Sequence, residues 1–73
     1  MSKEKSTKLQ KLGNRIQKMR KEKGWTQEEF AEYLNISRTH MGHIEQGRRE
    51  ASLSLLDKIA KKLNIRVNEL LPF

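Results

Sequence analysis

The chain has 73 residues, no cysteine and a formal net charge of +7 at pH 7. This length allows one compact domain, and the lack of cysteine excludes disulfides, thiolate zinc sites and catalytic thiols. No apolar run is as long as a membrane span or the core of a signal peptide, so we expect a cytoplasmic protein with no membrane partner.

The basic charge is concentrated in the first third of the chain. Residues 1–23 hold nine Lys and Arg against Glu4 and Glu22, which accounts for the whole excess. Such a segment suits the phosphates of a nucleic acid, and it equally suits an anionic membrane surface. Charge alone therefore does not choose between these two partners.

The chain begins with a polar segment and then becomes helical. Residues 1–7 carry no apolar side chain after the first residue and are predicted to be a flexible basic arm. A folded domain is expected over residues 8–73. Its first helix is predicted over residues 8–23, ending before Gly24, because apolar residues recur there at helical spacing: Leu9, Leu12, Ile16 and Met19.

The start of a second helix, over residues 27–34, is marked by two local signals. Thr26 and Glu29 have the spacing of a capping box. Trp25 and Phe30 occupy the two positions of a hydrophobic staple, so we expect both rings in the core rather than against a ligand.

A third helix follows almost at once. Ser37 is a suitable N-cap, with Ile36 and Met41 as its staple, and the helix is expected to end near Gln46, at Gly47. Two short helices separated by three residues have the outline of a DNA-binding helix-turn-helix.

Two further helices complete the predicted fold. Ser52 caps a fourth helix whose apolar face is broad, comprising Leu53, Leu56, Ile59, Ala60 and Leu63. A short fifth helix is expected over residues 67–71, before Pro72. Because no strand pattern is present, the predicted fold class is all-α, a compact domain of five short helices.

The third helix has one face suited to reading DNA. A rotation of about 100° per residue turns Thr39, His43 and Gln46 outward, flanked by Arg38 and Gly42. Arg pairs with guanine, Gln with adenine, and Thr meets the thymine methyl group in the major groove. An ordinary solvated helix face is the alternative interpretation.

Two charged residues lie on apolar stripes. Arg20 follows Ile16 by one turn, and Glu45 is on the inward side of the third helix. An unpaired charge there would cost several kcal/mol, so we expect an ion pair between the two side chains.

From Leu12 to Leu71 the sequence resembles the Cro and lambda-repressor type of helix-turn-helix, the XRE family. The resemblance rests above all on Gly13, Ile16, Arg20, Gly24, Trp25-Thr26-Gln27-Glu28-Glu29, Ala31, Leu34, Ile36-Ser37, Ile44-Glu45, Gly47, Ser52-Leu53, Leu56, Ile59-Ala60, Leu63 and Glu69-Leu70-Leu71. It implies a lambda-repressor-like five-helix domain that binds double-stranded DNA and regulates transcription. It also supports the pairing of Arg20 with Glu45.

The resemblance also implies roles for single residues. Arg38, Thr39 and His43 would reach base edges, to which the outward face adds Gln46. Gln27 would meet a phosphate, as would Arg48 and Arg49 in the following loop, and Lys8 would extend the arm's phosphate contacts with Lys3 and Lys5. Arg66 departs from the small polar cap that the family has before the last helix, and Glu50 replaces a neutral residue, so the fifth helix and the loop contacts are the least supported.

No catalytic chemistry is indicated. The sequence has no nucleophile and base arrangement, no glycine-rich phosphate loop and no paired carboxylates. His40 and His43 have no evident third ligand, so neither a metal nor another cofactor is expected. The protein is predicted not to be an enzyme.

The C-terminal segment is richer in apolar side chains than a five-residue helix can easily bury. We expect Val67, Leu70, Leu71 and Phe73 to form a homodimer interface, unless they close the monomer's own core. A dimer would bind a palindromic operator. Further candidate partners are RNA polymerase and, for an antitoxin-type regulator, a toxin. The interpretation from another class is a protein-interaction or membrane-surface module.

Overall fold

The computed structural model describes residues 7–72, and within this range the fold is entirely helical, as predicted. Its helices are α1 (Lys8–Glu22), α2 (Gln27–Leu34), α3 (Arg38–Glu45), α4 (Leu53–Leu63) and α5 (Val67–Leu70). The starts of all five agree with the prediction, and three ends lie one residue earlier than expected. Residues 1–6 of the predicted arm, including Lys3 and Lys5, lie outside the described residues, as does Phe73.

Thr7, predicted as part of the arm, is instead the N-cap of α1. Its hydroxyl oxygen accepts the backbone N–H of Gln10 at 3.1 Å, and the Gln10 side-chain oxygen accepts the N–H of Thr7 at 3.0 Å. This is a complete capping box. The folded domain therefore starts one residue earlier than predicted.

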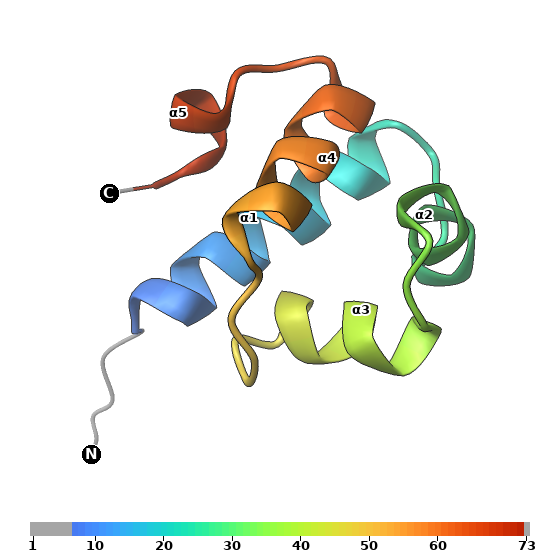
Figure 1. Ribbon diagram of the computed structural model, residues 1–73, viewed down its shortest axis with the longest axis horizontal. Helices are drawn as coiled ribbons and strands as arrows, with labels where there is room; N and C mark the ends of the chain where they lie inside the picture. Colours follow the sequence, from blue (N-terminus) through green and yellow to red (C-terminus); the bar gives the residue numbers. More distant parts are fainter. Residues whose placement is uncertain (1–6, 73) are drawn as a thin grey trace.

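The helices surround one apolar core, with α3 along the lower edge of Figure 1. Helix α3 packs against α1 and α2, α4 packs against α2, and α5 packs against α1 and α4. The core side chains come from α1 to α5: Leu12, Ile16, Phe30, Ala31, Leu34, Met41, Ile44, Leu55, Leu56, Ile59, Ala60, Leu63 and Leu70. One side of α3 is thus held by three-dimensional packing, and its other side faces outward.

The predicted staple at the start of α2 is present. The Trp25 and Phe30 rings stack with centroids 5.3 Å apart, and Tyr33 meets Trp25 edge-on at 5.1 Å. Phe30 is fully buried and Trp25 is half-buried against the core. Both rings therefore fix the entry into α2.

Helix α5 forms without a small polar cap. The Glu69 carboxylate accepts the backbone N–H of Arg66 at 2.8 Å, and Arg15 of α1 donates to the Glu69 carbonyl at 2.9 Å. Leu70 is completely buried in the monomer. The prediction that Leu70 faces a partner is wrong for this side chain, because it closes the domain's own core.

Candidate DNA-binding surface

The inner side of α3 carries a buried ion pair. Arg20 donates through Nε to Glu45 Oε2 at 2.7 Å and through Nη2 to Glu45 Oε1 at 3.1 Å. Its Nη1 donates to the Trp25 carbonyl at 2.6 Å. Only 7% of the Arg20 side chain and none of the Glu45 side chain is exposed. The structure thus brings together the two charges that the sequence predicts to pair, and it joins α1, the start of α2 and the end of α3.

Two glycines allow α1 to approach the end of α3 closely. A Cβ atom at Gly13 would lie 2.5 Å from the carbonyl oxygens of both Ile44 and Glu45. At Gly47, where φ is +74°, a Cβ would lie 2.7 Å from the Cα of Gln10. Since the obstructing atoms are mostly backbone, a side chain at either place would push the helices apart.

The outer side of α3 forms an open hollow, which we call the α3 hollow. Its lining residues all bear polar groups or lack a side chain: Gln27, Arg38, Thr39, Gly42, His43, Gln46 and Arg48. The four predicted base-contacting residues are therefore gathered on one surface with Gln27 and Arg48, two of the predicted phosphate-contacting residues. The lining contains two cationic side chains and no carboxylate, which suits an anionic ligand.

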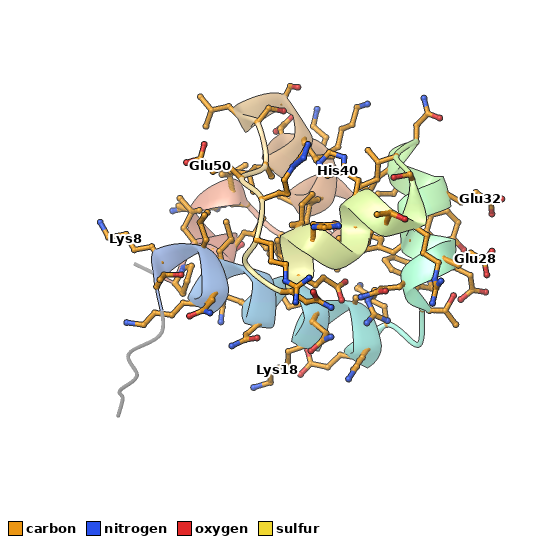
Figure 2. All side chains as sticks on the ribbon, turned by 90° about the horizontal axis from the view of Figure 1, so that it is seen from below. Lys8, Lys18, Glu28, Glu32, His40 and Glu50 are labelled. Carbon is orange, nitrogen blue, oxygen red and sulfur yellow. The ribbon has the colours of Figure 1, made fainter. Side chains whose placement is uncertain are left out.

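The other two predicted phosphate-contacting residues lie outside this hollow. Arg49 lines a neighbouring depression with Ser37, Thr39, His40 and His43. Lys8 lies at the start of α1, to one side of α3 in Figure 2. The predicted phosphate-contacting residues therefore come from three different parts of the fold.

Gln27 connects the outer surface to the buried pair. Its Nε2 donates to Glu45 Oε1 at 3.0 Å, so one carboxylate oxygen accepts from both Arg20 and Gln27. This contact spans 18 positions in sequence. The family resemblance suggests a role for Gln27 at DNA, but no local pattern in the sequence reveals its link to Glu45.

The described residues offer no alternative chemistry of two kinds. Within residues 7–72, no group of three His, Cys, Asp or Glu side chains is placed to hold a metal ion. No helix of this part of the chain is long and apolar enough to cross a membrane.

The sequence matches a family model described as helix-turn-helix over residues 16–70. The chain belongs to the helix-turn-helix family. It is 47% identical over 60 residues to YazB of Bacillus subtilis, an uncharacterized HTH-type transcriptional regulator, covering 82% of this chain and 87% of that protein. It is 43% identical over 61 residues to the control protein C.MunI of a Mycoplasma species, covering 82% of each.

Solved structures agree with this family assignment. The restriction-modification controller protein C.AhdI of Aeromonas hydrophila superposes with a TM-score of 0.81 at 37% identity, covering 85% of this chain and 94% of that one. SinR, the master regulator for biofilm formation, solved in complex with DNA, gives a TM-score of 0.76 at 33% identity, covering 82% and 97%. The protein is therefore a DNA-binding transcriptional regulator of the XRE type, and not a member of an enzyme class.

Proposed function

We propose that this regulator acts in the cytoplasm as a homodimer that reads a two-fold symmetric operator with α3 in the major groove. The α3 hollow carries this proposal, because it combines hydrogen-bonding side chains with a glycine that allows close approach. Arg38, Thr39, His43 and Gln46 are the proposed base-contacting residues. The side chains of Arg38, Thr39 and Gln46 are exposed, as a groove-reading surface requires.

Phosphate contacts are proposed to surround these base contacts. Arg48 and Arg49 follow α3 directly, and Lys8 lies on the basic helix α1. Glu28 and Glu32 of α2 project at the opposite edge of the view in Figure 2. This uneven charge favours a DNA backbone that runs along the α1 side and the loop after α3, because phosphates are attracted to Lys and Arg and repelled by carboxylates.

The dimer is proposed to form through the C-terminal segment. Val67 and Leu71 are half-buried and pack beside the core, so each keeps apolar surface for a second copy. Phe73, which lies outside the described residues, stays part of this proposal. Burial against a partner would add to the stability of a chain with a small core.

The operator proposal is tested by selecting bound fragments from random DNA at fixed salt, followed by footprinting. We expect a nearly palindromic site whose half-sites are about 34 Å apart, one turn of the double helix. Selection without sequence preference, or a single asymmetric half-site, would contradict the proposal.

The dimer proposal is tested with the double variant Val67→Asp and Leu71→Asp in sedimentation. We expect a helical monomer that binds the full operator far more weakly, since each half-site must then be held alone. The matched control is Leu53→Asp, because Leu53 is 82% exposed and lies outside the proposed interface. A double variant that stays dimeric places the interface elsewhere.

A further inference from the structure

We propose that Gln27, projecting from α2, reads a base edge, and that Glu45 is the positioning residue that sets the orientation of its amide. The inference rests on the proposed operator binding and goes further, because the family resemblance gives Gln27 only a phosphate. Its basis is a hydrogen bond from the Gln27 amide to a buried, charge-paired carboxylate.

The first step is the orientation of the amide. Glu45 is paired with Arg20 through both carboxylate oxygens, and an ionised carboxylate only accepts hydrogen bonds. The Gln27 atom 3.0 Å from Glu45 must therefore be the nitrogen. One of its two hydrogens is used there, and the oxygen Oε1 is directed elsewhere.

The second step is the position of that oxygen. Oε1 lies 3.7 Å from the place that a Cβ atom would occupy at Gly42, and Nε2 lies 4.0 Å from it. Gly42 lies on the outer side of α3, within the α3 hollow. The amide of Gln27 thus lies beside the one position of this surface where α3 supplies no side chain, and it extends the reading surface from a second helix.

The third step is the choice of ligand. The amide retains one N–H donor and one carbonyl acceptor. A phosphate presents only acceptors, so it matches the N–H but repels Oε1. Adenine presents an acceptor, N7, beside a donor, the N6 amino group, in the major groove, and this pair complements a glutamine amide. The oriented amide therefore favours adenine over a phosphate.

The experiment measures base preference by selection from random DNA, with affinities for the selected site and for random DNA at one salt concentration. For Gln27→Ala we expect the preference for adenine at one position per half-site to fall about 5- to 140-fold. Affinity for random DNA should stay within about two-fold, because a neutral amide releases no counterions. Gln17→Ala is the matched control, since Gln17 is on α1 and lies outside the α3 hollow.

A second variant, Gly42→Leu, tests the same amide without altering Gln27. Its side chain would cover the amide on an open surface, so we expect the same loss of preference with helicity retained. Equal weakening on selected and random DNA for Gln27→Ala would mean a phosphate contact and would overturn the inference, as would unchanged binding. If the unmodified protein itself selects no sequence, the operator proposal fails first, and this inference fails with it.

Discussion

The two sides of α3 differ in how tightly the fold determines them. On the inner side, Met41 and Ile44 are buried in the core and Glu45 is held by hydrogen bonds from two other helices. On the outer side, Arg38 and Thr39 border an open hollow. The inner side sets where the helix lies, and the outer side is free to determine what it reads. Substitutions on the two sides should therefore affect different measurements.

The largest effect is expected from Glu45→Ala on the inner side. The variant leaves the buried Arg20 guanidinium without its carboxylate, which should lower the free energy of unfolding by about 3 to 5 kcal/mol. Thermal or urea unfolding followed by circular dichroism measures this loss. Glu50→Ala, an exposed glutamate in the following loop, is the control and should change stability by no more than about 0.5 kcal/mol. Equal stability of the two variants would refute the distinction.

The next effect compares a glycine on each side of the helix contact. Gly13→Ala places a methyl group against two backbone carbonyls and should destabilise the fold by about 1 to 3 kcal/mol. Gly42→Ala meets only the end of Gln27 at ordinary contact distance. It should raise the melting temperature, because alanine is favoured over glycine inside a helix by about 1 kcal/mol. The comparison loses its basis if Gly13→Ala proves as stable as Gly42→Ala.

On the outer side the effect should be on binding and not on folding. Arg38→Ala or His43→Ala should relax base preference at one position per half-site, at a cost of about 1 to 3 kcal/mol in operator binding. Arg49→Ala should weaken binding to all sequences and reduce the salt dependence by about one counterion per subunit. Titrations at several salt concentrations separate these outcomes. Identical losses on operator and random DNA for all three variants would show that the assigned roles are incorrect.

The smallest effect is expected at a surface ion pair. Lys61 and Asp57 of α4 are 3.1 Å apart, but their side chains remain 76% and 53% exposed. Water screens such a pair, so Asp57→Asn should change the free energy of unfolding by no more than about 0.5 kcal/mol. A loss near that of Glu45→Ala would show that burial does not distinguish the two pairs.

Local signals in the sequence were enough to predict the helices. The capping residues Thr26, Ser37 and Ser52 each accept the backbone N–H three residues later, at the predicted helix starts. The same signal is present at Thr7 and Gln10, where the absence of nearby apolar residues suggested an arm instead. A capping box therefore outweighs polarity in locating the start of α1.

Contacts between distant positions were harder to predict. The pairing of Arg20 with Glu45 was accessible because a charge on an apolar stripe needs a partner. Nothing local indicates that Gln27 completes that pair, or that Gly13 lies against the end of α3. For Leu70, a helix of four residues is too short for periodicity to distinguish a core side chain from an interface side chain.

The turn between α2 and α3 is built from a hexapeptide pattern that occurs twice. Residues 31–36 and 60–65 both read Ala-x-x-Leu-Asn-Ile, and each asparagine is left-handed, with φ near 60°. In each, the isoleucine N–H returns to the alanine carbonyl, at 3.0 Å and 2.9 Å. The same stop and change of direction thus follows both α2 and α4. This connector is a reusable part with no specificity of its own, and α3 gains its distinct role from what it packs against after the turn.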